Sequence, residues 1–167
     1  SEMCIRDRGS MEFGGCFLNK RLNRNNDGGT TRRTTDIFQL ATTVLFQNPV
    51  QNFALAPNNL EDVSPVCMDY MKTIPTTWDE TCFIDGYPGK YVVLARRHGG
   101  TWYVAAINAG KETLKLKLDL EMFAGKTVSL YKDDKKGAPQ LVPLKVKENG
   151  KVQLEILPQG GAVLVNK

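Results

Sequence analysis

The hydrophobic pattern of this chain changes its period once, around residues 75–90. Before this stretch apolar residues recur at the three- and four-residue spacing of an amphipathic helix, whereas after it they alternate with polar residues in short runs. The stretch itself contains Pro75, Pro88 and two glycines, so neither a helix nor a central strand can pass through it. We therefore expect a helical part, a connector over residues 75–90, and a β part over residues 91–167.

Two large aromatic residues, Trp78 and Tyr87, lie in the expected connector. Because a buried aromatic side chain supplies a large contact area, we expect both to hold the two parts of the chain together. The competing interpretation is an aromatic platform for a ligand such as a sugar ring. Such a platform would draw on the residues Trp78, Tyr87, Trp102 and Tyr103. A flat exposed strip of these side chains would favour the platform, and burial would favour the packing role.

The composition is that of an ordinary globular chain able to bury a core, with 41% hydrophobic and 24% charged residues among 167. The net charge of +4 comes from lysines and arginines scattered among acidic residues. This distribution argues against nucleic-acid binding. The sequence has no apolar run close to the roughly 20 residues that a membrane helix needs, so we predict no membrane segment.

The cysteines do not form a metal-binding pattern. They are Cys4, Cys16, Cys67 and Cys82, and no two of them stand in a CxxC motif. They also share no metal-ligand spacing with the single histidine, His98, so the sequence predicts no zinc site. The pattern leaves their disulfide state open.

Residues 1–8 show neither periodicity nor a capping signal and look like a translated sequencing adapter. We expect them to be an artefact and the natural chain to continue upstream. Residues 9–33 have the composition of a polar loop. Asp36 then predicts a helix N-cap, with Gln39 as its capping-box partner. Apolar residues at helical spacing follow, namely Ile37, Leu40, Ala41, Val44 and Leu45.

Residues 50–55 predict a short strand, and residues 65–73 predict a second helix. The order helix, strand, polar loop, helix is typical of an α/β barrel. Two helices and one strand cannot close a barrel. The pattern therefore indicates only part of one.

Beyond residue 90 the sequence predicts about seven short strands. Residues 91–97 and 101–108 form the first two, joined by a glycine-containing turn. The leucines of residues 114–120 alternate with charged residues, so one face of that strand is buried and the other faces water. The remaining strands are expected around residues 128–130, 141–146, 152–156 and 162–165. This pattern predicts a two-sheet antiparallel sandwich of about 90 residues.

Several of these segments together resemble the C-terminal end of glycoside hydrolase family 97. The most specific are Pro-Thr-Thr-Trp-Asp-Glu-Thr over residues 75–81 and Gly-Tyr-Pro-Gly-Lys-Tyr over residues 86–91. The weaker matches are residues 9–13, 39–41, 46–49, 51–54 and 160–162. Members of the family have an N-terminal β-sandwich, a catalytic (β/α)8 barrel and a small C-terminal β-sandwich. The resemblance therefore implies a mixed fold, with the last part of the barrel over residues 9–74 and an all-β antiparallel sandwich over residues 91–167.

The resemblance also implies that the catalytic machinery lies elsewhere. Glycosidases use two carboxylates that flank the scissile bond. In this family those groups, and the glutamates that hold calcium in the inverting members, lie upstream of residues 9–13. Glu12 stands where relatives carry an aspartate, within a run that differs from theirs, so we assign it no catalytic role. We expect the chain alone to be inactive, with no catalytic residue, metal ligand or cofactor of its own; calcium would concern the parent enzyme.

Asn58 and Asn59 are the candidate substrate-binding residues. They follow the predicted strand at residues 50–55, on the face where barrel enzymes bind substrate. Relatives often carry an acidic residue where Leu55 and Asn58 stand, which weakens the assignment. The adjacent acids Asp79 and Glu80 are expected to serve a turn or a cap.

The resemblance implies a non-catalytic C-terminal part of a carbohydrate-cleaving enzyme. The parent would hydrolyse α-linked oligosaccharides, as an α-glucosidase or α-galactosidase, in the bacterial periplasm or outside the cell. Two alternatives stay open. One is a carbohydrate-binding module, and the other is a structural module that packs against the barrel or self-associates through the sandwich. The residues present separate neither inverting from retaining chemistry nor glucoside from galactoside preference.

Overall fold

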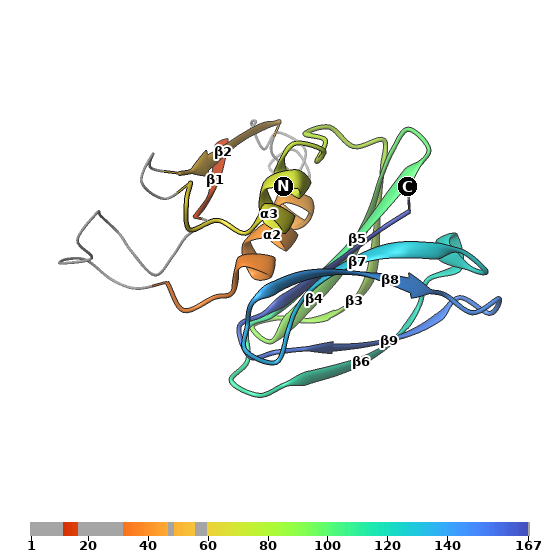
Figure 1. The fold of residues 1–167 in the computed structure, drawn as a ribbon. Coiled ribbons are helices and arrows are strands. Elements are labelled where there is room, and N and C mark those ends of the chain that lie inside the picture. Colours follow the sequence, from red (N-terminus) through yellow and green to blue (C-terminus); the bar gives the residue numbers. More distant parts are fainter. Residues whose placement is uncertain (1–11, 17–31, 47–48, 56–59, 167) are drawn as a thin grey trace, which may run out of the picture.

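The computed structural model describes residues 12–16, 32–46, 49–55 and 60–166, and for residues 12–16 it describes the backbone alone (Figure 1). The helical part comprises β1 (Glu12–Cys16), α2 (Asp36–Leu45), β2 (Val50–Ala54) and α3 (Pro65–Met71). The β part comprises β3 (Glu80–Tyr87), β4 (Tyr91–His98), β5 (Thr101–Asn108), β6 (Leu114–Asp119), β7 (Thr127–Asp133), β8 (Pro139–Lys145), β9 (Lys151–Ile156) and β10 (Gly161–Val165), with a 3-10 turn at Glu121–Phe123.

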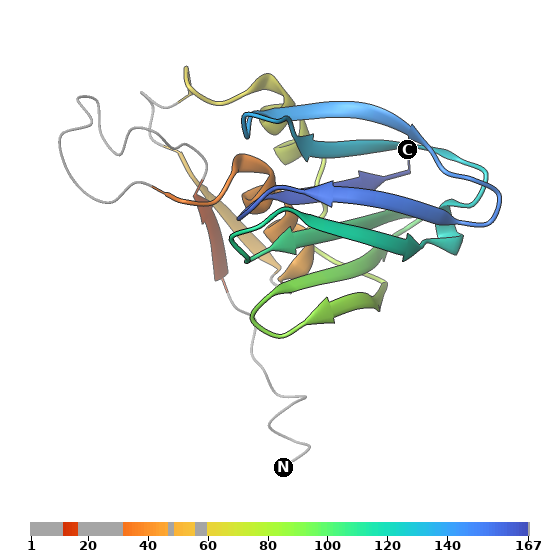
Figure 2. The same cartoon turned by 90° about the horizontal axis from the view of Figure 1, so that it is seen from below.

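The strands of the β part form two antiparallel sheets, which confirms the predicted sandwich. The larger sheet has six strands in the order β3-β4-β5-β10-β7-β8, and the smaller one pairs β6 with β9. Apolar residues of β6 face apolar residues of β9, as in the pair Leu116 and Leu154, while Lys115 and Glu155 pair on the outer side. Figures 1 and 2 show the smaller sheet on one side of the larger sheet and the helices on the other.

The expected connector is shorter than residues 75–90, because Glu80–Tyr87 forms strand β3. The glycine and the proline that argued against a central strand are compatible with a strand at this position. The strand lies at the edge of the sheet, and its register shifts between Phe83 and Asp85, which marks a bulge. Pro88 and Gly89 lie in the turn to β4, where Gly89 has a φ of 76°. A proline and a glycine therefore end this edge strand without interrupting it.

The expected polar loop over residues 9–33 is also interrupted by a strand, β1. It pairs in parallel with β2, and helix α2 lies between the two in sequence. Consecutive glycines weaken strand propensity, which explains why the sequence alone did not indicate β1. A parallel pair connected through a helix is the repeating unit of α/β folds, although two strands do not define a barrel.

Helix α2 begins one residue earlier than its predicted cap implied. Thr35 is the N-cap, and its hydroxyl accepts a hydrogen bond from the Phe38 amide at 3.2 Å. Asp36 is the first helical residue, where a negative charge is favourable to the helix dipole. The side-chain amide of Gln39 donates to the Thr34 hydroxyl at 2.9 Å rather than completing a capping box.

Two hydrophobic cores share the six-stranded sheet. The inner core fills the space between the two sheets, and the helix-side core lies between the larger sheet and helices α2 and α3. Side chains of β5 alternate between them, with Val104 and Ala106 in the inner core and Tyr103 and Ala105 in the helix-side core. The central strand β5 is therefore apolar on both faces, as expected for a strand covered on both sides.

Gly161 at the start of β10 lets helix α2 approach the sheet closely. A Cβ atom built at Gly161 would lie 2.8 Å from the carbonyl oxygen of Ile37 and 2.8 Å from the Cα of Phe38. Both neighbours are backbone atoms of the first helical turn, so they cannot move aside as a flexible side chain would. Any side chain at position 161 must therefore displace the helix.

We predict that Gly161→Ala lowers the free energy of unfolding by about 1–3 kcal/mol through overpacking. The matched control is Gly100→Ala, since nothing lies within 4 Å of the added methyl group at that position. Urea denaturation of the two variants and the wild type measures the difference. Equal stability of the two variants would mean that α2 is not held against Gly161.

Candidate functional site

The N-terminus of α2 is fixed to the sheet by a carboxylate that lies far away in sequence. The Thr35 hydroxyl donates to Oδ2 of Asp133 at 2.8 Å while accepting the Phe38 amide, and the Gly161 amide donates to the same Oδ2 at 3.2 Å. The Thr35 amide also donates to the carbonyl of Gln159 at 3.0 Å. The helix cap, the end of β7 and the start of β10 thus meet at one carboxyl group.

Burial raises the pKa of the Asp133 carboxyl from 3.8 to about 6. The hydrogen bonds from Thr35 and Gly161 oppose the shift, and the neighbouring negative charge of Asp36 adds to it. Oδ1 of Asp133 has no hydrogen-bond partner among the described residues. Arg32 forms an ion pair with Asp36 instead.

The C-terminus of α2 is fixed to the sheet by a buried cation. Arg96 of β4 is 4% exposed, and its guanidinium donates to the carbonyls of Leu45 at 3.3 Å and Phe46 at 3.5 Å. A positive charge at this end of a helix interacts favourably with the helix dipole and with the carbonyls left free there. Burial lowers the pKa of Arg96, but an arginine stays charged in proteins.

Trp78 contacts both this cation and Tyr103 of strand β5. Its ring centroid is 5.8 Å from the guanidinium carbon of Arg96 and 5.3 Å from the centroid of Tyr103, in an edge-to-face arrangement with the latter. The side chain is partly buried against the helix-side core, which agrees with the expected packing role. The same expectation for Tyr87 is wrong, because Tyr87 ends an edge strand and is 59% exposed.

The four aromatic residues considered as a sugar platform do not form one surface. Trp102 packs against the inner core, and Tyr103 is buried in the helix-side core on the opposite face of the sheet. Trp78 packs on the helix side, and Tyr87 is exposed at the sheet edge. The arrangement therefore gives no support to a carbohydrate-binding strip built from these residues.

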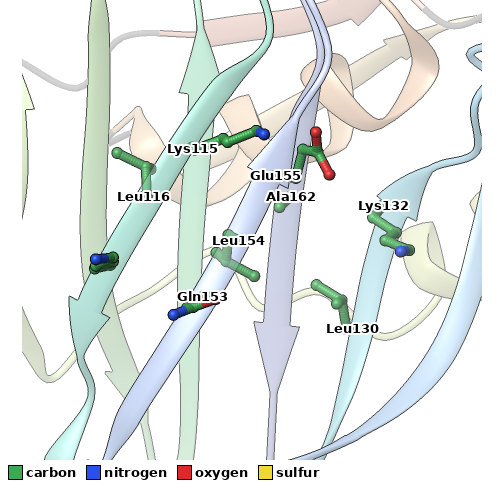
Figure 3. Close-up of a pocket in the computed structure, with 9 residues that line it drawn as sticks. Lys115, Leu116, Leu130, Lys132, Gln153, Leu154, Glu155 and Ala162 are labelled. Atoms are coloured by element: carbon green, nitrogen blue, oxygen red, sulfur yellow. The ribbon is translucent and has the colours of Figure 1, made fainter.

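An open depression of about 480 Å³ lies where β6 and β9 face β7 and β10 (Figure 3). Its lining is charged and aliphatic, and consists of Lys115, Leu116, Lys117, Leu130, Lys132, Gln153, Leu154, Glu155 and Ala162. Figure 3 shows Lys115, Glu155 and Lys132 on three different strands around it. Among these lining residues Glu155 supplies the one carboxylate and none is aromatic, so the depression offers neither a glycosidase carboxylate pair nor a stacking surface.

The acids of the connector have structural partners. Glu80 accepts from Nε of Arg97 at 3.1 Å, and Asp79 accepts the Gly99 amide at 2.7 Å and lies 3.7 Å from Arg97. These contacts connect the start of β3 to the β4–β5 turn, so the expected turn role is observed. His98 is exposed at the same turn, with Nδ1 2.9 Å from the carbonyl oxygen of Thr77.

The candidate sugar-binding residues Asn58 and Asn59 lie outside the described residues, and so does the side chain of Glu12. Within the described ranges there is no group of three or more His, Cys, Asp or Glu side chains that could hold a metal ion. In the same ranges no helix is both long and apolar enough to cross a membrane.

The sequence analysis did not identify the three residues that fix α2, namely Arg96, Asp133 and Gly161. One local signal was available for Arg96, because it follows Val92 and Leu94 on the apolar face of β4. A charged residue at an apolar position of the alternation indicates a buried partner. Asp133 carried no such signal, since its hydrogen-bond partner Thr35 lies 98 positions away.

Comparison with known proteins is consistent with this architecture. Residues 77–166 match the family model described as "Glycosyl-hydrolase 97 C-terminal, oligomerisation". A retaining alpha-galactosidase of Bacteroides thetaiotaomicron is 31% identical over 133 residues, which cover 75% of this chain and 20% of that protein. The β part therefore corresponds to the C-terminal domain that this family model describes. The chain belongs to glycoside hydrolase family 97, which confirms the resemblance inferred from the sequence.

Solved structures give the same assignment. A beta-arabinopyranosidase structure matches with a TM-score of 0.89 and 83% identity, over 95% of this chain and 25% of that one. A glycoside hydrolase family 97 enzyme from Pseudoalteromonas sp. strain K8, in complex with acarbose, matches with a TM-score of 0.72 and 26% identity, over 94% of this chain and 26% of that one. The chain thus spans about a fifth to a quarter of the length of these relatives.

We predict that Asp133 makes the stability of the chain depend on pH. A folded-state pKa of about 6 against 3.8 means that the native state binds the proton more tightly than the unfolded state does. The contribution of this group to stability is therefore highest below about pH 4 and falls as pH rises through about 6, by at most about 3 kcal/mol. Urea denaturation at pH 4 and pH 7 measures the change.

The free energy of unfolding of Asp133→Asn should rise relative to that of the wild type as the pH is raised from 4 to 7. The reason is that the side-chain amide of the introduced asparagine still accepts hydrogen bonds but does not ionise. Asp119→Asn, which removes an exposed carboxyl on β6, is the control and should follow the wild-type profile. Parallel pH profiles for the wild type and Asp133→Asn would contradict the assigned pKa shift.

We also predict that Trp78→Ala lowers the free energy of unfolding by about 2–4 kcal/mol, because the substitution leaves a cavity beside Tyr103 and Arg96. Leu141→Ala, which truncates an exposed apolar residue of β8, should change it by less than about 0.5 kcal/mol. Urea denaturation with and without excess maltose tests both effects. Unchanged stability together with the loss of a maltose-dependent shift in Trp78→Ala would favour a sugar platform instead.

Proposed function

We propose that this chain is the non-catalytic C-terminal part of a family 97 glycosidase that acts on α-galactosides and on β-arabinopyranosides. The observation that carries the proposal is the 83% identity to a beta-arabinopyranosidase structure over 95% of this chain. The similarity to a retaining alpha-galactosidase supports the galactoside part, and it favours a retaining parent enzyme.

The two substrate classes are chemically compatible. β-L-Arabinopyranose has the ring hydroxyl arrangement of α-D-galactopyranose and lacks only the hydroxymethyl group at C5. A pocket that binds the shared hydroxyl groups can therefore accept both sugars. The preference between them then depends on whether space is left for the hydroxymethyl group, since one such group changes binding by only a few kcal/mol.

We assign a positioning role to the chain within the parent enzyme. The β1–α2–β2 unit and α3 would form the last part of the catalytic barrel, and the six-stranded sheet would support that part from outside through α2. The contacts of α2 with Asp133, Gly161 and Arg96 support this role, because they fix both helix ends on the sheet. The candidate sugar-binding residues Asn58 and Asn59 would then follow a strand, β2, whose neighbouring helix is held in place.

A second proposed function is self-association. The family model that matches residues 77–166 is described as an oligomerisation domain, and this description supports it. We further propose that the parent is periplasmic or secreted, as the family resemblance implies. If the parent binds calcium, the family resemblance implies that its ligands lie upstream of residues 9–13.

We expect no turnover of nitrophenyl α-galactoside or nitrophenyl β-L-arabinopyranoside by this chain alone, with or without calcium. The same assay on the longer reading frame recovered from the same DNA should show hydrolysis of both. Turnover by the isolated chain, above that of a Glu12→Gln variant, would contradict the non-catalytic assignment. Activity of the longer protein on α-glucosides alone would contradict the proposed substrate class.

A further inference from the structure

The two edges of the six-stranded sheet differ in how they are protected against pairing. Edge strand β8 contains Pro139 and Pro143 and ends at Lys145, and all three residues hinder the addition of another strand. Edge strand β3 contains neither proline nor lysine, and the feature that interrupts it is the bulge between Phe83 and Asp85. Among the described residues no strand pairs with its outer side. One edge is thus blocked by its prolines and its lysine, whereas the other, the open edge, is interrupted only at its bulge.

The open edge also carries two of the three large hydrophobic residues that are exposed in the matched domain. The large exposed hydrophobic residues between positions 77 and 166 are Phe83, Tyr87 and Leu141, and the first two belong to β3. Phe83 is 67% exposed and Tyr87 is 59% exposed. Isolated exposed apolar residues are common, but two on one unpaired strand indicate a contact surface.

These two side chains lie on opposite faces of the sheet. Phe83 pairs with Leu94, which belongs to the helix-side core, whereas Tyr87 pairs with Tyr91, which packs against the inner core. Paired residues of an antiparallel ladder share a face. An incoming strand would meet one aromatic residue on each of its faces, whereas a ligand docked on one face would meet only one of them.

The middle of β3 is compatible with close approach of another chain. Gly86 has no side chain, and a Cβ at its position would lie 3.3 Å from the ring of Phe83, so the ring rests over the strand backbone. The carboxylate of Asp85 is occupied within its own strand pair, because it accepts from the Gly86 amide at 2.8 Å and from the Tyr91 hydroxyl at 3.2 Å. Its negative charge is therefore partly compensated.

We propose that the chain self-associates by antiparallel pairing of β3 with β3 of a second copy, around a two-fold axis near Phe83. This proposal rests on the proposed self-association and names its surface. A two-fold contact uses the same strand in both copies, so it closes on itself. Because the β8 edge is blocked by prolines, the pairing gives a dimer with one continuous sheet and not a filament.

The first test is the mass of the full chain in solution, measured by light scattering on a size-exclusion column over a range of concentrations. The wild type should be a dimer, and Phe83→Lys should weaken dimerisation at least about tenfold, since aromatic anchors dominate such interfaces. Leu141→Lys is the matched control, because it places the same charge at an exposed apolar position of the other edge strand. It should remain dimeric. Thermal melts show whether both variants are folded.

The second test is hydrogen exchange of the strand amides. Amides of β3 should exchange more slowly in the wild-type dimer than in Phe83→Lys, and amides of β8 should exchange equally in both. If Phe83→Lys loses the dimer but the exchange rates of the β3 amides do not change, the two copies associate through side-chain packing alone. That outcome would overturn strand pairing.

The remaining outcomes distinguish failure of the β3 surface from failure of self-association itself. A monomeric wild type would reject self-association and the β3 surface together, and slow exchange of β3 in that monomer would assign the edge to another segment of the same chain. A dimer that persists in Phe83→Lys would retain self-association and reject the β3 edge in either of two cases. In the first the β3 amides are unprotected in that dimer, and in the second the dimer is dissociated by Leu141→Lys.

Discussion

Helix α2 lies backbone against backbone on strand β10 at Gly161, and the placement of the helical part on the sheet depends on this contact. Close approach is possible because position 161 has no side chain. This close approach also brings the two termini of α2 within hydrogen-bonding distance of charged side chains of the sheet, Asp133 at the N-terminus and Arg96 at the C-terminus. Each charged group satisfies backbone or cap atoms of the helix, which water cannot reach readily in this layer.

The sequence predicted most of the β part because strands covered on one face alternate strictly. Leu116 and Leu118 of β6 and the apolar residues of β9 are buried as their spacing indicated. Strand β3 was missed for a physical reason. An edge strand tolerates a bulge and a terminal proline, which are signals against a central strand. Strand β1 was missed because its pairing with β2, and not its own propensity, places it in a sheet.

The contacts that fix α2 and the connector on the sheet were harder to predict from the sequence. Trp78 could be assigned to packing because a buried aromatic side chain supplies a large contact area, whereas Tyr87, which was assigned the same role, is exposed. The two residues differ in burial because Trp78 packs on the helix-side core, whereas Tyr87 lies at the end of edge strand β3. No local sequence pattern specifies this difference. The hydrogen bond between Thr35 and Asp133 joins residues 98 positions apart, and only the folded chain brings them together.

The double use of the six-stranded sheet has a consequence for where this protein can be divided. The family model begins at residue 77, yet the helix-side core contains Tyr103 and Val163 from the sheet together with Leu40 and Val44 from α2. A cut at that boundary would pass through a hydrophobic core and not through a solvated linker. The sandwich, although compact in sequence, would be released with one whole face unprotected from water. A unit that keeps this core intact must therefore contain the sandwich together with the helix that covers it.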